Sequence, residues 1–303
     1  MKIGLMLPLA ADETAGFADL RALAIEAEAS GLDSVWGADH LIFRDEKKTV
    51  GIHESWTVLT AVAAVTSRVE IGPLVLALPF RSPALTAKMA AELDEVSGGR
   101  LILGLGCGWH EPEFDAFGYP FDHRVGRFEE GMKIIGPLLR GESVTLEGRW
   151  HRVEDVELFP RPVRAGGPPI LIAGKQPRML RLVAEHAAQW NGAWYGFPDQ
   201  ANELRTRLAN VRGALEAANR DPATLTLTAG IFVAYEDAGD DAPERAIRGT
   251  TPEIADALAG YAELGITHLI THLFPRTPSA VARLGEAAAL ARERLGVTAV
   301  AAG

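Results

Sequence analysis

The feature that most constrains the fold of this chain is the alternation of short apolar segments with longer segments of helical pattern, repeated eight times. Several of the longer segments begin at a proline or end at a glycine, the residues that favour the first turn and the end of a helix. Such alternation implies a parallel sheet whose strands are joined by helices. Eight units in 303 residues predict an α/β fold of the (β/α)8 type, a TIM barrel, rather than an open doubly wound sheet.

The strands are expected at residues 2–8, 33–38, 69–78, 100–106, 168–174, 189–194, 225–235 and 267–274. The helices are expected at 16–30, 55–67, 83–99, 123–140, 177–188, 199–219, 251–265 and 279–296. Residues 109–168 interrupt this rhythm, because they add a hairpin that turns near Glu147 and Gly148. We interpret 109–168 as an insertion after the fourth strand that can serve as a lid, within a single domain spanning 1–303.

Composition narrows the possible functions. The net charge of −10 and the lack of a basic stripe interleaved with aromatic residues argue against nucleic-acid binding. The single cysteine, Cys107, cannot form an internal disulfide, which is typical of a cytoplasmic protein. No apolar run is long enough to span a membrane, and the N-terminus lacks the pattern of a signal peptide. The histidines show no metal-ligand spacing, so no metal site is predicted.

In a (β/α)8 barrel, the residues at the carboxyl ends of the strands form the active site. The second predicted strand runs directly into Asp39 and His40. A neutral imidazole beside an acid can donate and accept hydrogen bonds near pH 7, so both residues are candidate catalytic groups. The structural alternative is that Asp39 caps the next segment and His40 packs on the rim of the barrel.

The third and fourth strands contain glycine and proline where a regular strand would not. Gly72 and Pro73 indicate a bulge or an unusual peptide bond in the third strand. Gly104, Gly106 and Gly108 alternate at the end of the fourth strand. Their G-x-G-x-G spacing is not the G-x-G-x-x-G of dinucleotide-binding folds. We interpret these glycines as leaving room for a flat ligand against the strand end.

Groups that could bind or react with such a ligand follow the fourth strand. Gly106, Cys107 and Trp109 are expected to line it, and Trp109 offers a stacking surface. Glu113 is a candidate acid or base, unless it is only a solvated loop residue. Cys107 has no evident base beside it in the sequence and is therefore not a predicted nucleophile.

The fifth strand leads into a helix start, whose free N–H groups can bind a phosphate. The residues expected to do so are Ala173, Gly174, Lys175, Gln176 and Arg178. Arg181 lies one turn further along the same helix. In the sixth strand Trp190 is a further ligand-binding candidate, whereas His268 in the eighth is expected in the core. An aromatic, apolar pocket is suggested by Trp36, Phe43, Trp109, Trp190 and Trp194.

Four segments together resemble the luciferase-like monooxygenase superfamily, in particular its branch that depends on the deazaflavin coenzyme F420. They are GLDSVWGADH, SWTVLTAVAAVTSRVEIGPLV, RSPALTAKMAAELDEVSGGRLILGLGCGWHEPEFDAFG, and the pair PILIAG and LRLVAEHAAQWN. The resemblance runs from about residue 1 to 195, and residues 81–118 are its most specific part. It implies a (β/α)8 barrel with insertions, which agrees with the count of strands, and a homodimer.

The resemblance also implies roles for particular residues. Asp39 and His40 would border the cofactor ring, and a non-prolyl cis peptide at Leu74–Val75 would support the ring from behind. The phosphate would lie at Ala173, Gly174 and Lys175. The chain departs from the family at one place: members that oxidise a sugar phosphate have a glutamate acid where this chain has Trp109. A sugar-phosphate substrate is therefore not expected, and Glu113 is the candidate replacement acid.

The predicted function is hydride transfer between coenzyme F420 and a small organic substrate, in which the protein orients the ring. One alternative is an FMN-dependent monooxygenase, which uses reduced flavin and oxygen and needs a lid to protect its intermediate. Another is a flavin-binding protein without catalysis, which the presence of Asp39 and His40 disfavours.

Overall fold

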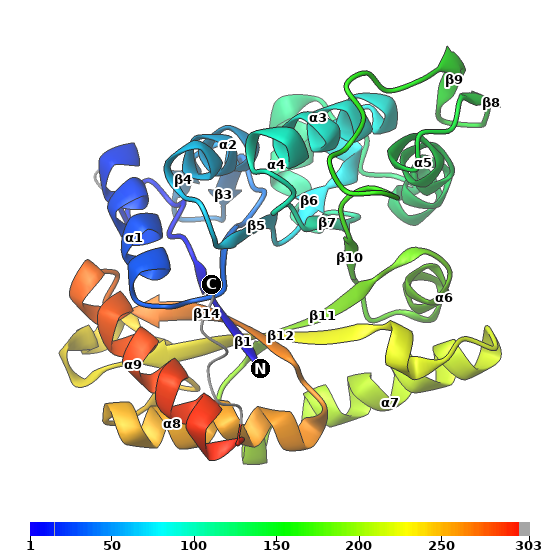
Figure 1. The fold of residues 1–303 in the computed structure, drawn as a ribbon. Coiled ribbons are helices and arrows are strands. Elements are labelled where there is room, and N and C mark those ends of the chain that lie inside the picture. Colours follow the sequence, from blue (N-terminus) through cyan, green and yellow to red (C-terminus); the bar gives the residue numbers. More distant parts are fainter. Residues whose placement is uncertain (15, 297–303) are drawn as a thin grey trace.

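The computed structural model describes residues 1–14 and 16–296, so the last part of the predicted domain, 297–303, lies outside the described residues. The structure has a parallel strand at each of the eight predicted positions of the barrel (Figure 1). The third strand is divided into two short ones. The barrel strands are β1 (Lys2–Met6), β2 (Ser34–Gly37), β5 (Glu70–Pro73) with β6 (Leu76–Ala77), β7 (Leu103–Gly106), β10 (Ile170–Ala173), β11 (Gln189–Tyr195), β12 (Thr226–Ala234) and β14 (His268–Phe274).

The strand order β5-β2-β1-β14-β12-β11-β10-β7-β6 closes on itself, because β5 and β6 are two parts of the third strand. β5 pairs with β2 on one side, and β6 pairs with β7 on the other. A parallel bridge between Ile71 and Leu101 adds to the closure. The predicted (β/α)8 barrel is therefore confirmed, with one short extra strand, β13 (Ile247–Arg248), on β12.

Helices surround the strands, as Figure 1 shows for α1 beside α9 and α3 beside α5. They are α1 (Phe17–Ala29), α2 (Ser55–Val65), α3 (Pro83–Val96), α4 (Glu111–Phe117), α5 (Arg124–Leu139), α6 (Pro177–His186), α7 (Asn202–Ala217), α8 (Thr251–Gly260) and α9 (Pro278–Arg294). Prolines in the first turns of α3, α6, α8 and α9 fit the missing N–H of that position. A capping box between Thr250 and Glu253 also fixes the start of α8.

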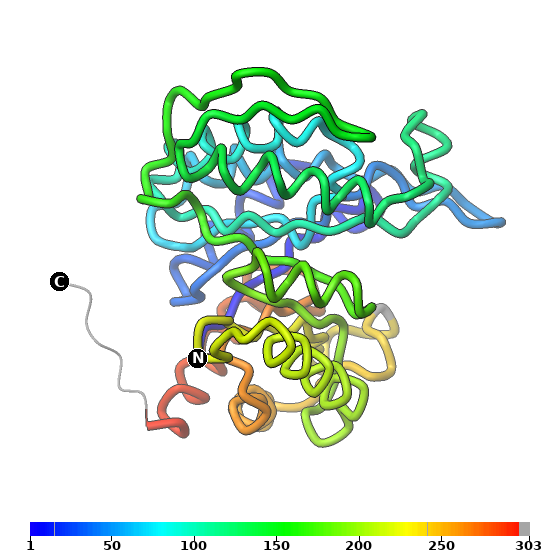
Figure 2. Tube along the Cα trace, turned by 90° about the vertical axis from the view of Figure 1, so that its right-hand side faces the viewer, coloured from blue at the N-terminus to red at the C-terminus, as the bar shows by residue number. Residues whose placement is uncertain are grey.

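The segment 109–168 contains α4, α5 and the predicted hairpin, formed by β8 (Val144–Glu147) and β9 (Arg152–Val156). α5 packs against both α3 and α6, which is the position of the outer helix after the fourth barrel strand. Only part of 109–168 is therefore additional to the barrel. A second hairpin, β3 (Ile42–Arg44) with β4 (Thr49–Gly51), follows β2 and contacts α4. Figure 2 shows the β3–β4 hairpin and the segment around α4 projecting at the same edge of the molecule. The lid role stays a prediction.

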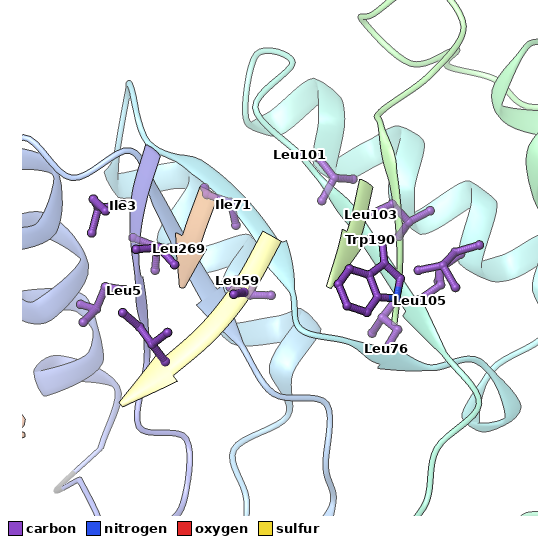
Figure 3. Packing of buried hydrophobic residues seen from close by; sticks show 14 of the residues in the cluster. Ile3, Leu5, Leu59, Ile71, Leu76, Leu101, Leu103, Leu105, Trp190 and Leu269 are labelled. Atoms are coloured by element: carbon purple, nitrogen blue, oxygen red, sulfur yellow. The ribbon is translucent and has the colours of Figure 1, made fainter. Parts of the chain in front are cut away.

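Alternation along the strands divides the apolar side chains into two sets. One set faces the helices, as seen in Figure 3, where Ile3, Leu5, Leu59, Ile71 and Leu269 gather on one side and Leu76, Leu101, Leu103, Leu105 and Trp190 on the other. The second set fills the interior of the barrel and includes Met6, Trp36, Ile102, Leu171 and Ile270. Both sets are almost fully buried, so the barrel is a packed core that leaves its carboxyl end for a site.

His268 is the core histidine that the sequence predicts, since it is 1% exposed. It lies 2.7 Å from the hydroxyl of Ser34, which also accepts a hydrogen bond from the indole of Trp36. Burial lowers the pKa of His268 to about 3, so its imidazole is neutral at pH 7.

Among the residues described, no helix has the length and hydropathy that crossing a membrane requires. The homodimer and the cytoplasmic location stay predictions.

Candidate active site

A cavity of about 1140 Å³ opens at the carboxyl ends of the barrel strands. This volume slightly exceeds that of an ordinary small-molecule pocket, so it can hold a large cofactor together with a substrate. Of the 14 residues predicted for the site, 13 line this cavity. They are Asp39, His40, Leu74, Val75, Gly106, Cys107, Trp109, Glu113, Ala173, Gly174, Lys175, Gln176 and Trp190.

His40 and Glu113 form a hydrogen-bonded pair in the cavity wall. His40 Nδ1 lies 2.9 Å from Glu113 Oε1, and Glu113 Oε2 accepts a hydrogen bond from the backbone N–H of Leu41. The Glu113 side chain is buried, because α4 places it beneath the loop that follows β2. Glu113 is therefore not a solvated loop acid. Its carboxylate fixes the orientation of the His40 ring, as a carboxylate does in a catalytic triad.

Asp39 belongs to a different network. Its two oxygens accept hydrogen bonds from the guanidinium of Arg81 at 2.8 and 2.9 Å, and one of them also accepts from the backbone N–H of Ala77. Arg81 also binds Glu54, which caps the start of α2. Burial alone would lower the pKa of Arg81, but the hydrogen bonds and charges of Asp39 and Glu54 raise it. These contacts give Asp39 a structural role, but it holds Arg81 and the backbone of Ala77 in β6 and does not cap the next segment, as the structural alternative had it.

The third strand carries the predicted cis peptide at Leu74–Val75, between β5 and β6. Both residues line the cavity. A second non-prolyl cis peptide, Ala193–Trp194, lies in β11, and no feature of the sequence had indicated it.

Close packing explains why glycine occupies three positions at the end of the fourth strand. A Cβ on Gly104 would lie 2.0 Å from the backbone oxygen of Pro73, and one on Gly106 would lie 2.7 Å from Val75. A Cβ on Gly108 would lie 2.5 Å from the ring of Phe114. Close packing of the protein therefore already requires glycine at these positions. Gly106 and Gly108 also line the cavity, so the interpretation that they leave room for a ligand stays a prediction.

The predicted phosphate-binding stretch lies where α6 begins, and Lys175 forms no ion pair with any described residue. Arg178 is the one predicted site residue that does not line the cavity. Its guanidinium donates to Glu129, which also binds Arg181. Hydrogen bonds from these two arginines hold the pKa of Glu129 below its usual range. The positive charge of Arg178 and Arg181 is thus partly neutralised by Glu129.

Arg124 is a cation in the cavity wall that the sequence reasoning missed. Its guanidinium lies 3.4 Å from the ring centre of Phe121, and its Nη1 is buried without a hydrogen-bond partner among the described residues. Its charge acts on the neighbouring Cys107 thiol. A signal was available: Arg124 begins a predicted helix, and in this barrel the helix starts lie at the same end as the carboxyl ends of the strands.

Cys107 lines the cavity as a neutral thiol. Burial raises its pKa to about 12, and the charges of Arg124 and Arg178 only partly oppose this effect. A thiol with this pKa is not a nucleophile at pH 7. Its Sγ lies 3.3 Å from Met179 Sδ, so Cys107 contributes shape and polarizability to the wall.

Aromatic residues surround the mouth of the cavity. The ring of His40 lies 4.3 Å from that of Phe43 and 5.6 Å from that of Trp109, measured between centroids. Trp109 is 65% exposed, so it is available to a ligand. Trp190 also lines the cavity and donates a hydrogen bond to the carbonyl of Gly174. Trp36 does not belong to the pocket, since it is buried inside the barrel.

The opposite wall contains residues that the sequence reasoning did not connect. Trp194, Phe232 and His272 come from β11, β12 and β14 and all line the cavity. Arg207 of α7 lines it as well, but donates to the carbonyl of Ala193 and is paired with Glu203. Of these residues, the sequence predicted only Trp194 for the pocket. The signal for His272 was that it lies near a strand end.

Comparison with known proteins identifies the class to which this barrel belongs. The family described as luciferase-like monooxygenase matches residues 1–295. The chain therefore belongs to the luciferase-like monooxygenase family, as the sequence resemblance implied.

Individual relatives and structures agree with this class. The chain is 33% identical over 236 residues to an F420-dependent glucose-6-phosphate dehydrogenase of Amycolatopsis mediterranei, which covers 75% of this chain and 68% of the relative. An F420-dependent secondary alcohol dehydrogenase solved with an F420-acetone adduct has a TM-score of 0.80 at 19% identity and covers 96% of this chain and 99% of its own. The structure of the riboflavin lyase RcaE with modified FMN and riboflavin also has a TM-score of 0.80, at 16% identity. The match covers 99% of this chain and 92% of the lyase chain. These two structures share the fold with this chain.

Proposed function

We propose that this protein is an oxidoreductase that transfers a hydride between coenzyme F420 and a small organic substrate. The F420-dependent relative, which shares a third of its residues with this chain over most of its length, supports the choice of cofactor. The observation that carries the proposal is the His40–Glu113 pair, which lies in the cavity wall. The same cavity is lined by Arg124 and Lys175, two cations that form no ion pair with any described residue. The pair can move a proton, and the cations can hold a phosphate.

The cavity fits a phosphate-bearing deazaflavin. The buried, unpartnered Nη1 of Arg124 and the unpaired ammonium of Lys175 can both bind a phosphate oxygen. The backbone around Gly174 and Gln176, at the start of α6, can add N–H donors. Leu74 and Val75 offer an apolar surface for the ring. When bound, the deazaflavin supplies the centre that accepts or donates the hydride.

The remaining chemistry belongs to the chain itself. Oxidation of an alcohol requires a group that takes the hydroxyl proton, and reduction of a ketone requires one that returns it. His40 can do both, because Glu113 accepts the hydrogen bond of Nδ1 and leaves Nε2 for the substrate. Glu113 stabilises the imidazolium that forms. Asp39 is a positioning residue in this mechanism, because Arg81 and Ala77 occupy its oxygens.

Titration of the cofactor-free protein with coenzyme F420 and with FMN tests the proposal. We expect F420 to bind at least tenfold more tightly, a difference of about 1.4 kcal/mol. Two other proteins with this fold were solved with F420 and with modified FMN, so the barrel alone does not select the cofactor. Equal or tighter binding of FMN would contradict the proposal and favour a flavin-dependent monooxygenase.

A further inference from the structure

We infer that the ends of β11, β12 and β14 form a substrate subsite for an uncharged molecule with a planar ring and one hydrogen-bonding oxygen. This inference rests on the proposed function and specifies its substrate. The subsite, here called the aromatic wall, consists of Trp194, Phe232 and His272, all of which line the cavity. The strands that carry them are neighbours in the barrel, so the three rings form one continuous surface.

The rings of the aromatic wall support one another. The centroid of Trp194 lies 5.6 Å from that of Phe232 and 5.5 Å from that of His272, and the last two are 5.7 Å apart. These distances are typical of favourable aromatic pairs. Phe274 packs behind His272 at 5.4 Å. The wall is therefore held in place before a ligand arrives.

Gly230 explains why the indole of Trp194 can lie against the sheet. A Cβ at Gly230 would stand only 2.6 Å from the indole ring of Trp194. The absence of a side chain in β12 thus creates the space that the indole fills. A planar ligand can stack on a rigid aromatic surface of this kind with little loss of side-chain entropy.

His272 adds an imidazole to the wall, beside the indole N–H of Trp194. Its Nδ1 is buried and has no hydrogen-bond partner among the described residues. Buried polar atoms are nearly always paired, so an unpartnered one in a cavity wall indicates a missing ligand or water. Burial, assisted by the charge of Arg276, lowers the pKa of His272 to about 4. The imidazole is then neutral at pH 7 and offers one donor and one acceptor.

Two of the three arginines near the wall are ion-paired, and the third, Arg245, does not line the cavity, so they do not call for an anionic substrate. Arg207 is paired with Glu203, and Arg276 is paired with Glu13 and lies over Phe274. The guanidinium of Arg245 lies 4.9 Å from the ring centre of Phe232. The unpaired cations of the cavity, Arg124 and Lys175, belong to the proposed cofactor phosphate. An uncharged substrate therefore fits this wall better than a phosphorylated one.

Three related probes test the inference: 2-naphthol, naphthalene, which lacks the oxygen, and 2-naphthoate, which is charged. We expect 2-naphthol to bind at least tenfold more tightly than 2-naphthoate in calorimetric titrations of the cofactor-free protein. This comparison needs no variant, so it does not depend on a substitution being tolerated. Equal or tighter binding of 2-naphthoate would overturn the inference.

Variants then locate the binding. His272→Phe keeps a ring but removes both nitrogens. It should lower the affinity for 2-naphthol about fivefold, as expected for one lost hydrogen bond, and leave the affinity for naphthalene unchanged. Trp194→Ala should lower the affinity for both probes about tenfold or more. Phe159→Ala, at a residue 68% exposed and away from the cavity lining, is the matched control and should change neither. Unchanged binding in both wall variants would contradict the inference.

The titrations are repeated with the protein saturated with coenzyme F420. If F420 leaves the affinity for 2-naphthol unchanged or increases it, the wall is a substrate site. If F420 displaces 2-naphthol, the wall belongs to the cofactor and the inference fails. Failure of F420 to bind at all would contradict the proposed function, while binding of 2-naphthol to the wall would still establish the subsite.

Discussion

The imidazole Nδ1 of His40 lies 2.9 Å from Oε1 of Glu113, although 73 positions separate the two residues in the chain. The loop after β2 and the helix α4 meet at this contact, so the pair forms only when these two segments pack together. A buried carboxylate that holds a histidine is a positioning device as well as a charge.

Removing either member of the pair should lower turnover. We expect His40→Ala to reduce kcat about 100-fold and Glu113→Gln about tenfold or more, the usual range for an acid–base group and its support. The double variant should be no slower than His40→Ala alone, since Glu113 acts through the histidine. The measurement is kcat with F420 and an uncharged alcohol or ketone found by screening. Additive losses, or weaker F420 binding as their cause, would contradict this assignment.

Arg81 should be essential for stability, because it neutralises the buried Asp39 and also binds Glu54. Arg81→Met leaves the Asp39 carboxylate without a cation, and we expect a loss of about 3–5 kcal/mol in the free energy of unfolding. Urea denaturation at pH 7 measures it. Arg140→Met breaks the exposed pair with Glu142 and is the control, with an expected loss below about 1 kcal/mol. Equal losses in both variants would show that the Asp39 network is not a stabilising one.

Gly104 and Gly213 should respond in opposite ways to alanine. At Gly104 the new Cβ would meet the backbone oxygen of Pro73, so we expect Gly104→Ala to destabilise the barrel by about 3 kcal/mol or more. Gly213 lies within α7 with no atom near a new Cβ, so Gly213→Ala should stabilise by about 0.5–1 kcal/mol. Thermal unfolding distinguishes the two, and a tolerated Gly104→Ala would refute the packing argument.

The two buried histidines should make the protein sensitive to mild acid. The pKa values of His268 and His272 are lowered by burial to about 3 and about 4, while the unfolded chain binds these protons near pH 6.5. The unfolded state therefore binds more protons between pH 6.5 and about 4, so stability is complete above pH 6.5 and declines as the pH falls. At pH 5 each buried histidine should lower the free energy of unfolding by about 2 kcal/mol relative to pH 7.

Urea unfolding at pH 7 and pH 5 measures this decline. His272→Phe removes one of the two buried groups and should remove about half of the difference between the two pH values. His123→Phe, at an exposed position, should leave the difference as it is in the parent protein. A difference that His272→Phe does not reduce would show that other groups cause the acid sensitivity.

Arg124 and Arg178 should differ in their importance for the cofactor. Arg124 lines the cavity with a buried, unpartnered nitrogen, whereas Arg178 is paired with Glu129 outside it. We expect Arg124→Gln to weaken F420 binding about tenfold or more, the scale of a lost charge-assisted hydrogen bond. Arg178→Gln should change the affinity less than twofold. Titrations at low and moderate salt measure both, and the reverse order would restore the role that the sequence assigned to Arg178.

The sequence by itself determined the fold and most of the residues that line the cavity. Alternation of apolar and helical segments indicated each barrel strand and outer helix, because every unit must bury one face locally. Strand ends then indicated His40, Lys175 and Trp190, since parallel strands bring their carboxyl ends to one edge. The chemistry of a strand end can therefore be read without knowing which strands are neighbours.

Only the tertiary structure decided which side chains pair. Arg81 engages Asp39, Glu129 engages Arg178, and Val75 fills the space beside Gly106. The aromatic wall is likewise built from strands that lie far apart in the sequence. These contacts depend on distances of a few ångströms between segments that share no local pattern. Periodicity reports which face of a segment is buried, but only the packed barrel determines what that face meets.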